Sequence, residues 1–242
     1  MTDRSPGAFR STAVAVVAFG VAMGYLEAAV VVYLRSAIAT GSVIPTHDLA
    51  TLGTFEAVEI ARELATLVMI AAVGWLAGRT RLERLAWAAV VFGVWDIIYY
   101  LGLRLAIGWP PSLWAWDVLF LVPAPWVGPV WAPIAVSVAL IAFGLVAARR
   151  LRASRPIVVG PRRALTGLAG GGLVIASFLV DTDRVLAGGS SDWTGWPIFW
   201  VGMALATAAT VGAIGGSSIA PAPGGVPVRH GSGNRPSVGS PD

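Results

Sequence analysis

Residues 92–133 read FGVWDIIYYLGLRLAIGWPPSLWAWDVLFLVPAPWVGPVWAP. This stretch contains two Trp-Asp pairs, Trp95-Asp96 and Trp116-Asp117, and six of the sixteen prolines of the chain. The flanking residues are apolar enough to lie in a lipid bilayer, where a carboxylate is costly and often marks a functional site. The stretch therefore predicts a break between helices and a functional site at the same place.

The composition indicates a helical membrane protein. Of the 242 residues, 56% are hydrophobic and 12% are charged, with a mean hydropathy of +0.75, whereas soluble domains carry about 25% charged residues. Several apolar runs are about 20 residues long, enough to cross a hydrocarbon core of about 30 Å. These runs are continuous rather than alternating, which argues against a β-barrel. We therefore expect an all-α polytopic bundle.

Apolar runs and breaks predict one transmembrane domain over residues 1–214. The expected spans are 12–34, 54–77, 85–107, 126–148, 164–181 and 194–214. Between the third and fourth spans we expect a short helix, 113–122, N-capped by Ser112. Its ten residues give about 15 Å, half a bilayer, so it should be re-entrant or interfacial. Residues 215–242 are rich in Gly, Ser and Pro and predict a disordered cytoplasmic tail.

The distribution of arginine predicts the orientation. All seventeen basic residues are Arg, and six spans with both termini in the cytoplasm place thirteen of them on the cytoplasmic side. This positive-inside pattern accounts for the basic balance without a nucleic-acid partner. Abundant Arg, Ala, Gly and Val are typical of a GC-rich bacterial genome. The expected location is therefore the bacterial cytoplasmic (inner) membrane.

The residue inventory excludes several chemistries. The chain has no Cys, which excludes thiolate metal sites and Fe–S clusters. Its two histidines, His47 and His230, lie outside the expected helices, which argues against haem. No serine-hydrolase elbow, zinc-protease or phosphate-loop motif is present. A divalent cation bound by carboxylates remains open.

The ionisable residues of the expected helices gather at one depth, in the outer half of the bilayer. Glu56, Glu59 and Glu63 share a helix face, and Asp96, Tyr100 and Arg104 form a second polar stripe at i, i+4 and i+8. We predict acid/base or cation-binding roles for Glu59, Glu63, Asp96 and Asp117. Predicted substrate-binding residues are Glu27, Arg62, Trp95, Tyr99, Tyr100, Arg104, Trp116 and Trp126.

Each of these residues also has a structural interpretation. Glu59, Arg62 and Glu63 can form an ion-pair cluster that only stabilises the bundle, and Asp96 can serve as a hydrogen-bonding strut. Two arginines, Arg62 and Arg104, cannot neutralise Glu27, Glu59, Glu63, Asp96 and Asp117 together. Some of the five should therefore hold a proton, a cation or a cationic group of a substrate.

The motifs Trp95-Asp96-Ile-Ile-Tyr-Tyr100 and Trp116-Asp117-Val-Leu-Phe through Pro-Trp126-Val-Gly-Pro-Val-Trp-Ala-Pro133, with Glu59-x-x-Arg-Glu63 upstream, carry a resemblance. Over roughly residues 20–140 the chain resembles a family of uncharacterised bacterial multi-pass membrane proteins. The resemblance implies a shared architecture and no activity.

Three functions fit the sequence. The first is a membrane-embedded enzyme or binding protein that takes a small or lipid-like ligand. The second is a proton- or cation-coupled transporter that uses the same carboxylates. The third is a non-catalytic subunit that docks to a larger membrane complex or to copies of itself. The gathering of polar residues beside a broken helix favours the first, and the apolar inner halves of the expected helices count against the second.

Overall fold

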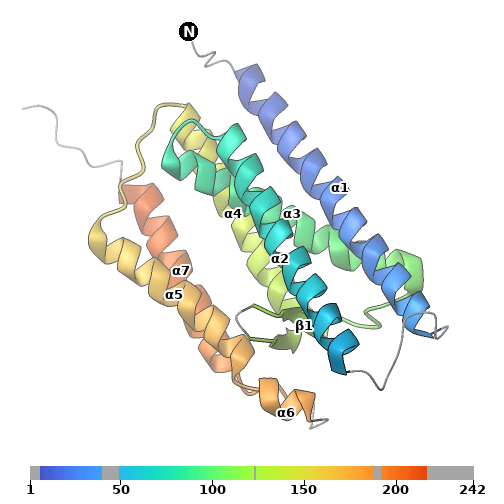
Figure 1. Cartoon of the computed structure of the whole chain (residues 1–242). Coiled ribbons are helices and arrows are strands. Elements are labelled where there is room, and N and C mark those ends of the chain that lie inside the picture. Colours follow the sequence, from blue (N-terminus) through green and yellow to red (C-terminus); the bar gives the residue numbers. More distant parts are fainter. Residues whose placement is uncertain (1–5, 40–48, 123, 188–191, 217–242) are drawn as a thin grey trace, which may run out of the picture.

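Six long apolar helices form the body of the molecule. The computed structural model describes residues 6–39, 49–122, 124–187 and 192–216. Six helices in these ranges are long and apolar enough to cross a membrane, which confirms the prediction of a multi-pass membrane protein. They lie side by side in a bundle (Figure 1). They are α1 (Pro6–Ala39), α2 (Leu49–Ala77), α3 (Arg81–Ile107), α4 (Trp131–Arg152), α5 (Pro161–Leu179) and α7 (Trp196–Gly215).

The helix ends differ from the expected ones by a few residues. The first helix begins at Pro6 rather than residue 12, and the fourth begins at Trp131 rather than residue 126. A five-residue helix, α6 (Thr182–Leu186), follows α5 and was not predicted. Residues 217–242 of the predicted tail lie outside the described residues, as does the loop that contains His47.

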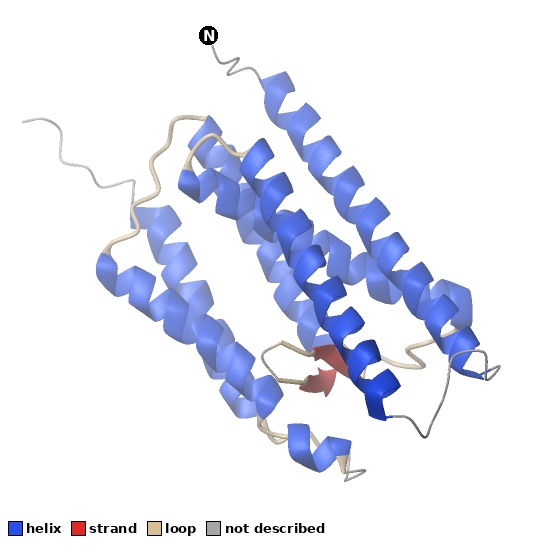
Figure 2. Cartoon of the chain, viewed as in Figure 1, coloured by secondary structure: helices blue, strands red, loops and turns tan. Residues whose placement is uncertain are grey.

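A β-hairpin stands where the short helix 113–122 was predicted, and that prediction was wrong. Strands β1 (Trp116–Phe120) and β2 (Trp126–Pro129) pair antiparallel, with Asp117 opposite Gly128 and an irregularity between Val118 and Phe120. They lie at one end of the bundle, beside the start of α4 (Figure 2). We call this end the hairpin end and the opposite end, where α4 finishes, the Arg152 end.

Proline explains why the segment forms strands. Pro123, Pro125 and Pro129 interrupt it, and each proline biases the preceding residue toward extended backbone. The run from Trp116 to Phe120 consists mostly of aromatic and β-branched residues, which favour strands. The Ser112 hydroxyl accepts the Trp114 N–H at 3.3 Å, but this contact closes only a turn. Residues 113–122 contain no proline themselves, but Pro111 and Pro123 bound them and leave only ten residues for a helix.

Helix α3 lies at the centre of the first four helices and packs against α1, α2 and α4. Glycine allows α1 to approach it closely, since a Cβ on Gly24 would lie 2.5 Å from the carbonyl oxygen of Trp95. This contact places Glu27, about one turn further along α1, beside the turn of α3 that follows Trp95 and Asp96, since the next residue of α1, Ala28, lies against Gly102. Gly20 and Gly24 thus permit a close approach that aligns the polar residues of two helices.

Helices α5 and α7 form a separate pair. A Cβ on Gly170 would lie 2.6 Å from the backbone nitrogen of Ala206, so Gly170 makes the close contact, whereas a Cβ on Gly171 would meet nothing within 4 Å. Aromatic rings connect this pair to the hairpin and to α4. Trp126 of β2 stacks on Phe178 of α5 with ring centroids 6.4 Å apart, and Trp131 of α4 packs edge-on against Phe199 of α7.

Candidate functional site

A small polar cavity lies among α1, α2, α3 and β1. Its volume is about 60 Å³, and a buried water needs roughly 10–15 Å³ of such space, so it has room for about four to six water-sized groups. Eight of the twelve predicted site residues line it. They are Glu27, Arg62, Glu63, Trp95, Asp96, Tyr99, Tyr100 and Asp117, and they are joined by Thr66, Val118, Leu119 and Phe120.

Arg62 is held by two carboxylates. Its guanidinium forms an ion pair with Glu27 of α1 and donates two hydrogen bonds to one oxygen of Glu59, at 3.0 and 2.8 Å. The Arg62 side chain is 26% exposed, more than either carboxylate. This triad joins α1 to α2 and leaves the positive charge of Arg62 fully compensated.

Glu63 holds the hairpin against the bundle. Both of its carboxylate oxygens accept the backbone N–H of Leu121, at 3.0 and 2.9 Å. Leu121 directly follows β1, so its N–H would otherwise lack the partner that a longer strand provides. Glu63 is 7% exposed, and a buried carboxylate of α2 thus fixes the position of the hairpin against the bundle.

Asp96 lies near the middle of α3 and points toward α4. Ser137 of α4 is fully buried and donates its hydroxyl hydrogen to Oδ2 of Asp96 at 2.8 Å. Asp96 itself is 8% exposed. A carboxylate can accept about four hydrogen bonds, and the Ser137 hydroxyl provides only one of them.

Asp117 of β1 faces α3 across the cavity. Tyr100 donates its phenolic hydrogen to Oδ2 of Asp117 at 3.1 Å. Burial raises the pKa of Asp117 to about 6, although the Tyr100 hydroxyl, the Val118 N–H and the charge of Arg35 each lower it. This carboxyl group therefore exchanges its proton close to neutral pH, in the range that suits acid–base chemistry.

Aromatic side chains form much of the cavity wall. Trp95, Tyr99, Tyr100 and Phe120 all line it, with Tyr99 and Tyr100 in edge contact at 5.1 Å and Trp95 and Phe120 6.2 Å apart. The indole N–H of Trp95 is buried without a hydrogen-bond partner. A buried donor of this kind costs free energy unless a bound group accepts from it.

Four predicted site residues lie away from the cavity wall. Glu59 contacts it only through Arg62. Arg104 instead donates to the carbonyl oxygens of Gly108 and Pro110, at 2.6 and 3.0 Å, and closes the end of α3. Trp126 packs between Phe120 and Phe178, and Trp116 does not line the cavity. Arg104 does not reach the cavity because it lies one turn beyond Tyr100 on α3, where its side chain bonds the end of the helix.

Sequence reasoning missed Thr66, Ser137 and the backbone of Leu121. Thr66 had a signal, because it follows Glu59 and Glu63 on the same helix face, and it is 2% exposed. Ser137 is a lone hydroxyl residue in an apolar helix, but nothing in the sequence pairs it with Asp96. The Leu121 N–H could not be found without the hairpin.

The carboxyl groups do not form a ready metal site. In the part of the chain that the structure describes, no three His, Cys, Asp or Glu side chains gather closely enough to hold a metal ion. The divalent cation that the sequence left open would therefore need ligands beyond the arrangement of these side chains.

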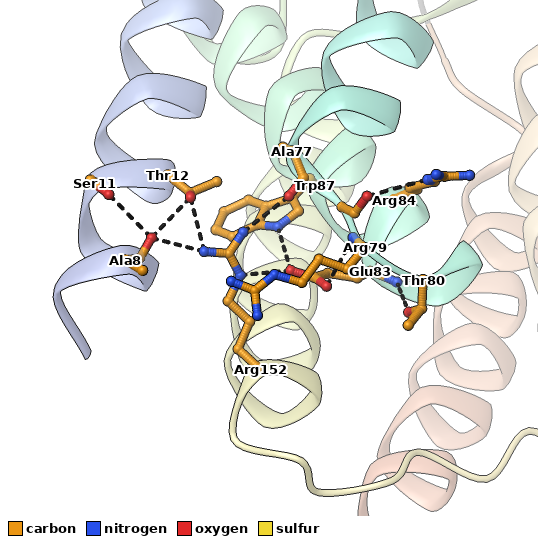
Figure 3. A network of polar contacts seen from close by, with 11 residues as sticks. Ala8, Ser11, Thr12, Ala77, Arg79, Thr80, Glu83, Arg84, Trp87 and Arg152 are labelled. Atoms are coloured by element: carbon orange, nitrogen blue, oxygen red, sulfur yellow. Dashed lines mark hydrogen bonds and ion pairs between the residues drawn. The ribbon is translucent and has the colours of Figure 1, made fainter. Parts of the chain in front are cut away.

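A second polar cluster lies at the Arg152 end, and sequence reasoning missed it. The Arg152 guanidinium donates to Glu83 at 2.6 Å, to the Ala8 carbonyl and Thr12 hydroxyl of α1, and to the Ala77 carbonyl of α2 (Figure 3). Glu83 is 2% exposed. The sequence placed both residues in basic connections that only set orientation. One arginine instead joins all four helices of the main bundle.

Comparisons of this chain with protein-family models, curated proteins and solved structures give no match.

Proposed function

We propose that this chain is a multi-pass protein of the bacterial cytoplasmic membrane whose cavity binds a small polar molecule or the polar head of a lipid-like substrate. One observation carries the proposal. Four carboxyl groups and one guanidinium, from three helices and a strand, surround a cavity of about 60 Å³ in an otherwise apolar bundle. Irregular backbone at membrane depth normally lines such a cavity.

The distribution of arginine supports an orientation with both termini in the cytoplasm. Arg79, Arg81 and Arg84 lie at the Arg152 end of the bundle. The cluster of arginines between residues 149 and 163 lies at the same end. Positive charge favours the cytoplasmic side. The hairpin end then faces outward, and the cavity opens toward the outer leaflet.

Packing between the two polar clusters favours binding over transport. On α3, the residues between Asp96 and Glu83 include Trp87, Val90 and Val91, all with no exposed surface. They belong to one apolar core with Val16 of α1 and Ile70 of α2. A proton or ion path through the bundle needs polar groups or water at this level, and these side chains supply neither.

The cavity also contains a group that can process what it binds. Asp117, with a pKa of about 6, can hold a proton below that pH and accept one above it. Tyr100 holds this carboxyl group in place. General acid–base chemistry on a bound head group is therefore the reaction class that the site supports best.

Native mass spectrometry of the full chain in a mild detergent tests the proposal. The protein is incubated with polar and lipid extracts of bacterial cells, and metals are measured in the same sample. We expect one bound molecule that Glu63→Gln and Asp96→Asn reduce and that Asp183→Asn, at an exposed position of α6, leaves unchanged. Equal spectra for all four proteins would overturn the proposal.

A further inference from the structure

We propose that the cavity recognises a protonated primary amine next to an acceptor oxygen, the chemistry of ethanolamine and of aminophospholipid head groups. The inference rests on the proposed binding function and narrows its ligand to one chemical class. It follows from the charge of the site, the nature of its walls, an unpaired donor and the cavity volume.

The charge of the site calls for a cation. Arg62 is compensated by Glu27 and Glu59. The other three carboxyl groups at the cavity, those of Glu63, Asp96 and Asp117, accept hydrogen bonds from a backbone N–H, a serine hydroxyl and a tyrosine hydroxyl. None of the three forms an ion pair with a described residue. An ammonium group has three N–H donors and no acceptor, which complements such a set.

The walls favour an organic ammonium over a metal ion. Trp95, Tyr99, Tyr100 and Phe120 line the same cavity, and aromatic faces attract ammonium groups but offer no lone pairs to a metal. No three acidic or histidine side chains of the described ranges cluster closely enough to hold a metal ion together. Aromatic rings interleaved with separate carboxyl groups suit a cation with an apolar stem.

An unpaired hydrogen-bond donor in the cavity wall indicates that the ligand also carries an acceptor oxygen. The indole N–H of Trp95 has no partner in the structure, and Trp95 lines the cavity and is 7% exposed. Carboxyl groups attract the amine of a ligand, and this N–H requires an acceptor on the same ligand. An oxygen a few bonds from the amine, either a hydroxyl or a phosphate ester oxygen, provides it.

The volume selects the size of the head group. A cavity of about 60 Å³ accommodates about four water-sized groups at roughly 15 Å³ each. Ethanolamine has the corresponding number of heavy atoms, whereas choline, with three methyl groups on nitrogen, exceeds it. Trimethylation also removes every N–H donor from the amine. The site should therefore distinguish a primary from a quaternary ammonium.

Binding measurements on the unmodified full chain test this selectivity directly. The detergent-solubilised protein is titrated with ethanolamine, ethylamine, choline, K⁺ and Mg²⁺, and thermal stabilisation is followed together with native mass spectra. We expect ethanolamine to bind and choline to bind at least about tenfold more weakly, because choline loses its charge-assisted hydrogen bonds. Equal binding of choline, or stronger binding of Mg²⁺, would overturn the inference. This comparison needs no variant, so a folding defect cannot obscure it.

Variants then assign the contacts. Asp96→Asn and Asp117→Asn should each weaken ethanolamine binding about tenfold, while Asp183→Asn should leave it unchanged. Trp95→Phe should weaken ethanolamine binding about fivefold but not ethylamine binding, since ethylamine has no oxygen to accept the indole N–H. Equal losses for both amines would contradict the role assigned to Trp95.

Measurements in nanodiscs of defined lipid composition identify whether the bound amine comes from a lipid or from a soluble molecule. Protein in nanodiscs of phosphatidylethanolamine, phosphatidylglycerol or phosphatidylcholine is released and analysed by native mass spectrometry. Selective retention of phosphatidylethanolamine assigns the site to a lipid head group, and binding of free ethanolamine without such retention assigns it to a soluble amine. If the extracts instead yield a neutral or anionic ligand whose binding is lost on Asp96→Asn, the inference of an amine ligand is refuted. The proposed binding function then still stands. Failure of every ligand class to bind would refute both.

Discussion

Both carboxylate oxygens of Glu63 on α2 accept the backbone N–H of Leu121, which lies 58 residues further along the sequence. This contact makes the hairpin part of the bundle rather than a surface loop. It also means that a residue with the pattern of a catalytic acid supports the site mechanically, because it positions the strand that carries Asp117. The two roles can be separated experimentally.

Substitution of Glu63 tests the mechanical role. Glu63→Ala leaves the Leu121 N–H unsatisfied and should lower the free energy of unfolding by about 1–3 kcal/mol. Glu63→Gln keeps a carbonyl acceptor and should lose less. Thermal unfolding in detergent measures the stability, and hydrogen exchange at Leu121 reports the contact itself. Unchanged exchange at Leu121 in the Ala variant would show that the hairpin is held by other contacts.

Removal of Arg152 should destabilise the whole four-helix bundle. Arg152→Gln leaves the carboxylate of Glu83 buried without its charged partner, which typically costs about 3–5 kcal/mol. Arg152→Lys should rescue little, because a single ammonium cannot reproduce the planar fork that reaches four acceptors. Arg155→Gln, at an exposed neighbouring position, is the matched control for thermal unfolding. Equal melting temperatures for the two Gln variants would contradict this prediction.

The stability of the protein should fall as Asp117 loses its proton. The folded protein holds this proton up to a pH of about 6, whereas an unfolded aspartic acid releases it near its ordinary pKa of 3.8. Deprotonation therefore disfavours the folded state, and stability should decline as the pH rises from about 4 to about 6 and then level off.

Asp117→Asn should remove this part of the pH dependence. Unfolding midpoints measured across that range, with wild type and variant compared at each pH, provide the test. Tyr100→Phe removes a hydrogen bond that favours the charged form, so it should raise the pKa of Asp117 further and shift the decline to higher pH. A wild-type profile parallel to that of Asp117→Asn would refute the assignment.

The approach of α1 to α3 should depend on Gly24. A methyl group there meets the Trp95 carbonyl at 2.5 Å, so Gly24→Ala should cost about 1–3 kcal/mol through overpacking and should weaken the Glu27–Arg62 ion pair. Gly172→Ala, on α5 with no atom within 4 Å of the added group, is the control. Thermal unfolding of both variants measures the difference, and equal stability would show that the helices separate at little cost.

The proposed orientation can be read from cysteine accessibility, since the chain has no native Cys. Ser112→Cys at the hairpin end and Ala153→Cys at the Arg152 end both occupy exposed positions. A membrane-impermeant maleimide should label Ser112→Cys in intact cells and Ala153→Cys only after permeabilisation. The reverse pattern would invert the orientation and place the cavity toward the cytoplasm.

The six spans could be predicted because long apolar runs have few alternatives. The gathering of Glu27, Glu63, Asp96 and Asp117 could also be anticipated, since topology places these residues at one depth. Their roles in binding or catalysis remain predictions. The sequence could not reveal which side chain meets which donor, because Ser137 and Leu121 reach their partners through tertiary packing.

The hairpin and the Arg152 cluster escaped prediction for different reasons. A short apolar run between prolines fits a helix or a strand equally well by length, and its partner strand was assigned to the following helix. Arg152 belongs to a group of arginines whose other members suit a membrane-surface role, so its burial with Glu83 has no signature in composition. The burial of Asp181 has no such signature either, since this residue follows an apolar run but is 3% exposed and accepts a hydrogen bond from Thr194.

The position of Arg152 has a consequence for biogenesis. The ribosome delivers α1, α2 and α3 to the membrane before the last turn of α4, yet contacts from that turn hold Ala8, Thr12, Ala77 and Glu83 together. The first three helices are therefore inserted before the contacts of Arg152 can connect them at this end. A nascent chain halted before residue 152 would leave the buried carboxylate of Glu83 without its cation.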